Sequence, residues 1–191
     1  MILKKGKLIA VSAPSGTGKT TIIRRVLKSF PDIVFSVSAT TRAKREDEVE
    51  GKHYYFITEE EFKKKIENNE FIEWEKFYDY YYGTYKSFVE DVINQGKSII
   101  LEIDVYGALK LKKIYPDAAL IYIVPPSIEE LTRRLKNRNT EGKSDLQKRI
   151  ERATMELSLK DKFDYLVENI DLEKALEKTK FLIEKITKKE I

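Results

Sequence analysis

Apolar residues fall into short runs that alternate with helical patterns along most of the chain. The run at 119–124 is nearly all apolar, which is typical of a strand that is covered on both faces. The segment 71–77 instead alternates apolar and polar residues, as a strand does. Patterns of these two kinds predict strands at 7–12, 33–38, 54–57, 71–77, 98–103, 119–124 and 165–168.

Helices are predicted between these strands by apolar spacing and by capping signals. Ile22, Ile23 and Val26 lie on one face of a helix over 19–29. Thr58 and Ser127 each begin a capping box, with glutamate three residues later. The remaining predicted helices are 87–95, a short one ending near 116, one following the 137–145 segment and ending near 160, and a terminal one capped by Asp171.

Strands that alternate with helices at both ends of the chain indicate an α/β domain with a parallel sheet flanked by helices. The middle of the chain is richer in strands and aromatic residues, which indicates an inserted subdomain. The segment 137–145 is polar and contains Gly142, so we predict a loop there. We expect one domain over 5–188, with its core at 5–32 and 91–188 and the insert at about 33–90.

The composition fits a single globular domain of 191 residues, 41% of them apolar. A net charge of +4 among 36% charged residues is too weak an excess to predict a nucleic-acid partner. Cysteine is absent, no apolar run approaches the roughly 18 residues of a membrane span, and no signal-peptide pattern precedes the first strand. We therefore expect no membrane partner and a cytoplasmic location. Glutamine is rare while lysine and glutamate abound, a bias that favours a heat-adapted source.

A glycine-rich turn joins the first predicted strand to the first helix. Such a turn points its backbone N–H groups at phosphate oxygens, and the positive end of the following helix adds attraction. Lys19 would reach the β- and γ-phosphates, and the Thr20 hydroxyl would bind Mg²⁺. The first residue of the usual pattern is glycine, which is alanine here. The predicted ATP-binding residues are Ala13, Pro14, Ser15, Gly16, Thr17, Gly18, Lys19 and Thr20.

A second signature follows the first helix and is far more specific. It consists of Ser36, Val37, Ser38, Ala39, Thr40, Thr41, Arg42, Arg45, Glu48, Gly51, Tyr54 and Phe56. Agreement continues in Asn69–Trp74, Tyr82–Thr84, Glu102–Asp104 and Pro125–Ser127. Together these motifs closely resemble those of guanylate kinases, in the same order and over about 7–188.

The resemblance implies a P-loop kinase core, a GMP-binding subdomain and a short lid at about 136–150. It implies direct in-line transfer of the γ-phosphoryl group of MgATP to GMP, and to dGMP as well, with GDP and ADP as products. Such an enzyme serves GMP recycling and guanine nucleotide synthesis.

The resemblance also implies roles for individual residues on the acceptor side. Arginine forks and tyrosine hydroxyls suit a phosphate. A carboxylate can accept from the guanine N1–H and 2-amino group, which adenine does not offer as a pair. The implied GMP-binding residues are Arg42, Arg45, Tyr54 and Tyr82 for the phosphate, Glu73, Ser38 and Thr84 for the base, and Asp104.

On the donor side, the resemblance implies that cations surround the transferring phosphoryl group. The implied catalytic residues are Lys19, Arg42, Arg134, Arg138 and Arg149, with Arg152 as a further candidate. Glu102 or Asp104 would orient waters of Mg²⁺, and Asn169 would contact the adenine. One departure is Tyr106, because the strand-end motif of the family commonly has glutamine there.

Two other interpretations stay open. Inert guanylate-kinase-like domains of membrane scaffolds, which bind phosphorylated peptides, resemble the family but typically lack a working phosphate loop, whereas Gly16, Gly18, Lys19 and Thr20 are present here. A kinase for another nucleoside monophosphate is the second, and Glu73 argues against AMP or UMP as the acceptor.

Overall fold

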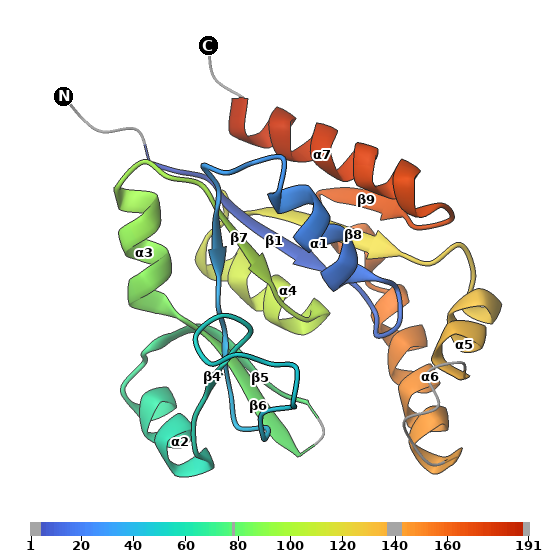
Figure 1. The fold of residues 1–191 in the computed structure, drawn as a ribbon, viewed down its shortest axis with the longest axis horizontal. Coiled ribbons are helices and arrows are strands. Elements are labelled where there is room, and N and C mark those ends of the chain that lie inside the picture. The colour runs from blue at the N-terminus through green and yellow to red at the C-terminus, as the bar shows by residue number, and fades with distance from the viewer. Residues whose placement is uncertain (1–4, 78, 137–142, 189–191) are drawn as a thin grey trace.

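The computed structural model describes residues 5–77, 79–136 and 143–188, which form two sheets surrounded by helices (Figure 1). The larger sheet is parallel throughout, in the order β2-β7-β1-β8-β9. Its strands are β1 (Leu8–Ser12), β2 (Val34–Ser36), β7 (Ile99–Glu102), β8 (Ala119–Val124) and β9 (Tyr165–Glu168). The predicted α/β class with a parallel sheet is confirmed.

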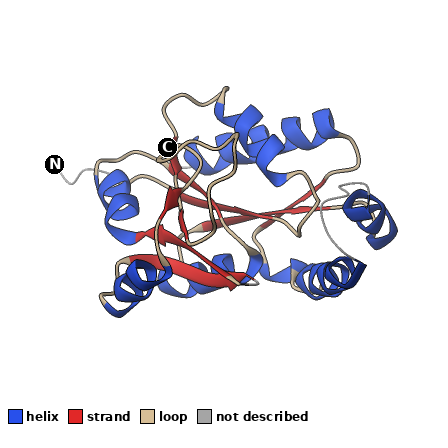
Figure 2. Ribbon diagram, turned by 60° about the horizontal axis from the view of Figure 1, so that its bottom comes forward, coloured by secondary structure: helices blue, strands red, loops and turns tan. Residues whose placement is uncertain are grey.

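Helices cover both faces of the larger sheet (Figure 2). On one face lie α1 (Lys19–Leu27) and α7 (Leu172–Lys188), and on the other α3 (Lys86–Asn94) and α4 (Val105–Ile114). Ile22 and Ile183 belong to the core of the first face, and Val89 and Leu111 to that of the second. Burial on both faces explains why these strands are continuous apolar runs in the sequence.

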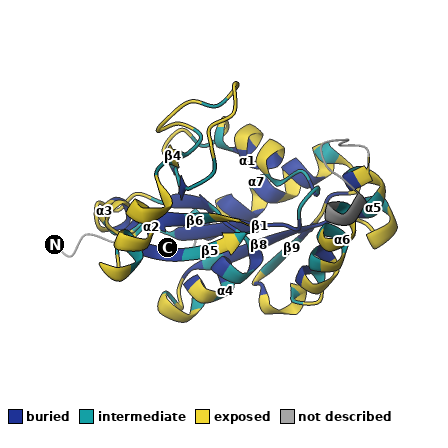
Figure 3. Ribbon diagram, turned by 90° about the horizontal axis from the view of Figure 1, so that it is seen from below, coloured by how far each residue is buried: buried dark blue, intermediate teal, exposed yellow. Residues whose placement is uncertain are grey.

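The smaller sheet has the order β4-β3-β6-β5 and a core of its own. Its strands are β3 (Ala39–Thr40), β4 (Tyr55–Phe56), β5 (Phe71–Phe77) and β6 (Tyr80–Tyr85), and α2 (Glu59–Glu67) packs beside them. The rings of Phe62 and Phe71 are stacked with centroids 4.4 Å apart. Figure 3 shows buried residues in both sheets and exposed residues on the outer faces of the helices.

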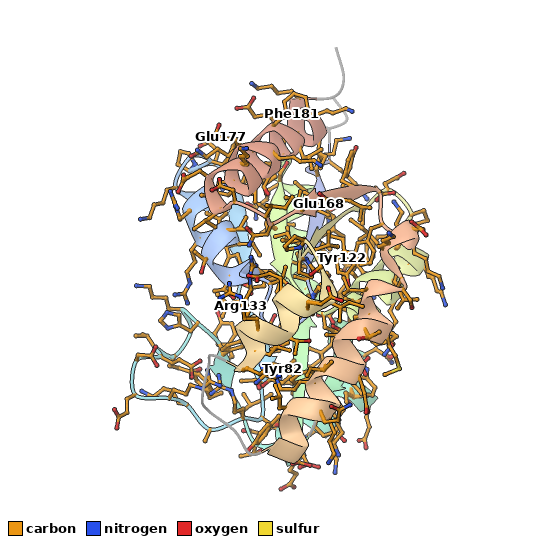
Figure 4. The ribbon with its side chains drawn as sticks, turned by 90° about the vertical axis from the view of Figure 1, so that its right-hand side faces the viewer. Tyr82, Tyr122, Arg133, Glu168, Glu177 and Phe181 are labelled. Carbon is orange, nitrogen blue, oxygen red and sulfur yellow. The ribbon has the colours of Figure 1, made fainter. Side chains whose placement is uncertain are left out.

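Two further helices follow β8: α5 (Ile128–Lys136) and α6 (Lys143–Leu157). They pack together through Leu131, Leu135 and Ala153 and lie side by side in Figures 1 and 4. A 3₁₀ turn, Lys160–Lys162, leads from α6 toward β9. These helices stand at the carboxyl end of the larger sheet, where ligands bind in open α/β sheets.

The structure differs from the sequence-based boundaries at three places. Residues 34–36 were assigned to the insert, but β2 pairs with Ile99–Leu101 of β7 in the larger sheet. The short strand β3 was not predicted, because its two residues carry no periodic pattern. Helix α6 begins at Lys143, inside the predicted loop, and ends at Leu157, before the predicted end near 160. Strands β2 and β3 are defined by pairing with distant segments, β2 with β7 and β3 with β6, which no local pattern predicts.

Candidate active site

A cavity of about 330 Å³ opens between the phosphate loop and the smaller sheet. The loop residues 13–20 line one side of it, and Glu102, Ile103 and Asp104 line its floor at the end of β7. The smaller sheet contributes a further wall, formed by Ser38, Tyr54, Glu73, Phe77, Tyr82 and Gly83. The structure thus brings predicted donor residues and predicted acceptor residues to one cavity.

The phosphate loop owes its shape to two glycines. Gly16 has φ +88° and Gly18 has φ +92°, a left-handed region where side chains are strained. The Thr17 hydroxyl donates to the Pro14 carbonyl at 2.8 Å and closes the turn. Gly18 is the N-cap of α1, so the first turn of that helix faces the cavity.

Asn169 supports this loop from behind. Its Nδ2 donates to the Thr17 carbonyl at 2.7 Å, and the side chain is buried. A Cβ at Gly18 would lie 3.0 Å from the same nitrogen, so the two residues fit closely. The predicted contact of Asn169 with adenine stays a prediction.

Lys19 and Thr20 both reach the end of β7. Lys19 Nζ donates to the Ile103 carbonyl at 2.9 Å and lies 3.9 Å from Glu102 Oε1. The Thr20 hydroxyl donates to the same carboxylate oxygen at 2.5 Å. A hydroxyl and a carboxylate side by side at a phosphate loop are hard oxygen ligands of the kind Mg²⁺ prefers.

The arginine of the second signature is fixed in place on the acceptor side. Arg42 forms a two-pronged ion pair with Glu48, at 2.7 and 3.0 Å, and its guanidinium lies over the rings of Tyr54 and Phe56. Hydrogen bonding to Arg42 lowers the pKa of the Glu48 carboxyl, and the same bond raises the pKa of Arg42. The Arg45 backbone N–H also donates to Glu48, while its side chain is exposed.

Two tyrosines of the cavity wall lie beside Arg42, which itself does not line the cavity. The rings of Tyr54 and Tyr82 meet edge to face with centroids 6.0 Å apart, and both line the cavity. Burial raises the pKa of Tyr54 to about 12, so its hydroxyl keeps its proton and can donate a hydrogen bond. The cation and the tyrosines together form a site suited to an anion.

A buried carboxylate lies deeper in the cavity. Glu73 is 6% exposed, and its Oε1 accepts a 2.6 Å hydrogen bond from the Thr84 hydroxyl, which is itself 3.2 Å from Ser38 Oγ. Burial raises the pKa of Glu73 to about 7. A Cβ at Gly107 would lie 2.6 Å from Glu73 Oε2, so a larger residue there would displace this carboxylate.

Asp104 caps a helix at the floor of the cavity. Its Oδ1 accepts a 3.0 Å hydrogen bond from the Gly107 backbone N–H, which makes it the N-cap of α4. It still lines the cavity, so a capping role and a ligand-binding role are compatible.

The four predicted lid-side arginines have different surroundings. Arg149 Nη2 donates to Ser15 Oγ in the phosphate loop at 2.6 Å. Arg134 donates to Glu130 at 2.7 Å and to the Asn169 carbonyl at 3.1 Å. Arg138 lies outside the described residues. Arg152 donates to Glu156 at 2.8 Å and lies 4.3 Å from the centre of the Phe77 ring.

Several residues that line the cavity were not predicted as site residues, and Glu156 and Phe77 are two of them. Glu156 is 5% exposed and lines the cavity from α6, where burial raises its pKa. Phe77 also lines the cavity, although it belongs to an aromatic-rich segment and was not among the predicted site residues. Glu156 sits in a highly charged helix, so its burial has no signal in the sequence.

In the part of the chain that the structure describes, no helix combines the length and apolarity needed to cross a membrane.

Comparison with known proteins identifies the family. The guanylate kinase family model matches residues 5–186. The guanylate kinase of Thermotoga maritima is 51% identical over 173 residues, covering 91% of this chain and 84% of that protein. The guanylate kinase of Caldanaerobacter subterraneus subsp. tengcongensis is 47% identical over 182 residues, covering 95% of this chain and 88% of that protein.

A solved structure agrees with this result. The crystal structure of guanylate kinase from Anaplasma phagocytophilum matches with a TM-score of 0.81 at 32% identity, covering 99% of this chain and 90% of that chain. This chain belongs to the guanylate kinase family and converts ATP and GMP to ADP and GDP.

Proposed function

We propose that MgATP is bound by the phosphate loop, that GMP lies against the smaller sheet, and that the γ-phosphoryl group passes directly between them. The observation that carries this assignment is the single cavity with residues 13–20 on one side and Glu73 and Tyr82 on the other. Both nucleotides then meet over the end of β7.

The acceptor phosphate would be held by Arg42 and Arg45, with the hydroxyls of Tyr54 and Tyr82. Arg42 is already oriented by Glu48 at 2.7 Å, so binding costs little side-chain ordering. The base would be read by Glu73, which accepts from the guanine N1–H and 2-amino group. These groups address phosphate and base, so dGMP should be accepted as well.

Catalysis in this assignment comes from placement and charge. The acceptor phosphate is ionised near neutral pH, so no strong general base is required. Lys19, Arg134, Arg138 and Arg149 would neutralise negative charge on the transferring group. Arg149 lies within hydrogen-bond reach of the loop, at 2.6 Å from Ser15 Oγ.

The oxygen groups at the loop fit a magnesium ion. Thr20 would hold it, and Glu102 or Asp104 would orient its waters, because hydroxyl, carboxylate and phosphate oxygens are the ligands it prefers. When bound, it supplies positive charge to the donor phosphates. Each protein group named here already lines the cavity.

A coupled assay of ADP release tests this function with GMP, dGMP, AMP, UMP and CMP as acceptors. We expect high activity with GMP and dGMP only, lost when EDTA removes Mg²⁺ and restored when Mg²⁺ is added. Equal activity with AMP, or full activity in EDTA, would contradict the assignment of the base site or of the metal.

A further inference from the structure

Arg152 lies where three parts of the molecule meet. It belongs to α6, and its Cζ is 4.3 Å from the centre of the Phe77 ring on β5 and 6.0 Å from that of Tyr106 on α4. Its Nε donates to Glu156 at 2.8 Å. Its buried Nη2 has no hydrogen-bond partner among the described residues, so the two ring faces and one carboxylate hold the guanidinium.

Contacts continue from Arg152 into the acceptor side of the cavity. The Phe77 ring meets the Tyr82 ring edge to face with centroids 6.4 Å apart. Tyr82 lines the proposed GMP site, and Glu73, which would read the base, belongs to the same strand as Phe77. A movement of β5 on GMP binding would therefore move the Phe77 ring against which the Arg152 guanidinium packs.

Contacts also continue from Arg152 to the donor side. Arg149 lies one helical turn earlier on α6 and donates to Ser15 Oγ in the phosphate loop at 2.6 Å. Glu156, one turn later, lines the cavity. Arg149 and Arg152 both belong to α6, so a movement of the whole helix would shift both residues.

We propose that Arg152 is a positioning residue that couples GMP binding to ATP binding by joining α6 to β5. This inference rests on the proposed function, which places GMP beside β5 and ATP at the phosphate loop. When GMP binds against β5, the guanidinium stacked on Phe77 holds α6 in the position from which Arg149 reaches the loop. By linkage, ATP must strengthen GMP binding by the same factor.

Tyr106 gives this chain its second ring face. Its ring centre lies 6.0 Å from Arg152 Cζ, on a helix that does not carry Phe77, so aromatic rings from two elements face the guanidinium. Arginine suits such a site better than lysine, because its planar guanidinium stacks and bonds to Glu156 at the same time. Tyr106, Phe77 and Glu156 thus hold Arg152 together.

Isothermal titration calorimetry tests the coupling with β,γ-imido-ATP and Mg²⁺, in the presence and absence of saturating GMP. For the unaltered enzyme we expect GMP to tighten binding of the analogue about fivefold or more. In Arg152→Met, the factor by which GMP tightens binding of the analogue should fall below about twofold. The Kd of each nucleotide alone should change less than about threefold. A merely structural role would lower Tm and weaken the binding of both nucleotides. It would not change the coupling factor, which is the ratio of the Kd of the analogue without GMP to its Kd with GMP.

Arg133→Met is the matched control, because Arg133 is a 65% exposed arginine on α5 that bonds only to Glu130 among the contacts described (Figure 4). Its coupling factor should equal that of the unaltered enzyme. If Arg152→Met does not fold, the coupling factor is measured on Arg152→Lys instead. This variant keeps a cation beside Glu156 but loses the planar group that stacks on the rings. An unaltered enzyme without coupling, or an Arg152 variant that keeps it, would overturn the proposal.

The proposed function can fail separately. If Glu73→Gln leaves GMP affinity unchanged, the placement of GMP is wrong, whatever the coupling factor of the Arg152 variants.

Discussion

The Thr84 hydroxyl donates a 2.6 Å hydrogen bond to Oε1 of Glu73, and both side chains are buried beside the cavity. Burial raises the pKa of Glu73 to about 7, and the bond from Thr84 acts against this rise. Without a ligand, the carboxylate therefore lacks the donors that would fully stabilise its charge. Guanine would supply two of them, through its N1–H and its 2-amino group.

GMP affinity should depend on pH through Glu73. Only the ionised carboxylate accepts both guanine hydrogen bonds, so raising the pH from about 6 to 8, through the pKa of about 7, should strengthen binding roughly tenfold. The GMP phosphate also titrates near pH 6, so calorimetry on Glu73→Gln provides the baseline. Identical pH profiles for the two proteins would contradict a base-reading carboxylate.

The stability of the ligand-free protein should show the opposite dependence. The folded state raises the pKa of Glu73 from 4.5 to about 7. The contribution of Glu73 to the free energy of unfolding is therefore complete below pH 4.5 and is lost as the pH rises through 7. The Glu73→Gln variant has no carboxyl at this position, so it does not lose this stability as the pH rises. The variant should be more stable than the unaltered protein by up to about 3 kcal/mol at pH 8 and nearly equal to it at pH 4.5.

Chemical denaturation of both ligand-free proteins at these two pH values measures this difference. A variant that is less stable at pH 8 would show that the buried carboxylate is fully compensated by its neighbours.

Arg42→Ala should weaken the binding of GMP and leave the binding of ATP unchanged. It removes a guanidinium from the acceptor side that Glu48 holds at 2.7 Å. Losing hydrogen bonds to a charged phosphate costs about 1.5–3 kcal/mol, so KM for GMP should rise roughly 10- to 100-fold. Steady-state kinetics with each nucleotide varied in turn measures the effect, and an equal rise in KM for ATP would show that Arg42 is misplaced.

Lys19→Ala should remove most phosphoryl transfer while the fold survives. Lys19 Nζ contacts the Ile103 carbonyl at 2.9 Å at the cavity floor, and Lys19 is not part of the apolar clusters that the described residues form. Loss of one preorganised donor to a developing charge typically lowers kcat about 10²- to 10³-fold. Turnover is read from ADP release and folding from circular dichroism; near-normal turnover would exclude Lys19 from the mechanism.

Local patterns predicted the elements of the fold well. Strand β5 begins at Phe71 and ends at Phe77, as the alternation of apolar and polar residues indicated. Thr58 and Glu61 form the predicted capping box at the start of α2. In each case the signal lies within a few neighbouring residues.

Long-range contacts were not predictable in the same way. The three residues of β2 look like part of the insert, and only their pairing with β7 places them in the larger sheet. In the site, the glycines and Lys19 follow from the loop pattern, whereas the role of Glu73 came from resemblance. The burial of Glu156 and the stacking of Arg152 on Phe77 join segments far apart in the chain, and no local pattern records them.

The most direct measurement is kcat/KM for GMP and AMP with the unaltered enzyme and with Glu73→Gln. The variant keeps the size of the side chain but places an NH₂ group against a guanine donor. A good bidentate contact to a base is worth about 1–3 kcal/mol, so kcat/KM for GMP should fall at least about tenfold.

AMP should gain relative to GMP in this variant, without becoming a good substrate, because Ser38 and Thr84 remain. IMP keeps N1–H but lacks the 2-amino group, so it should be a poor substrate of the unaltered enzyme and lose less from the change. This result would support Glu73 as the residue that reads guanine. An unchanged preference for GMP over AMP in Glu73→Gln would contradict it.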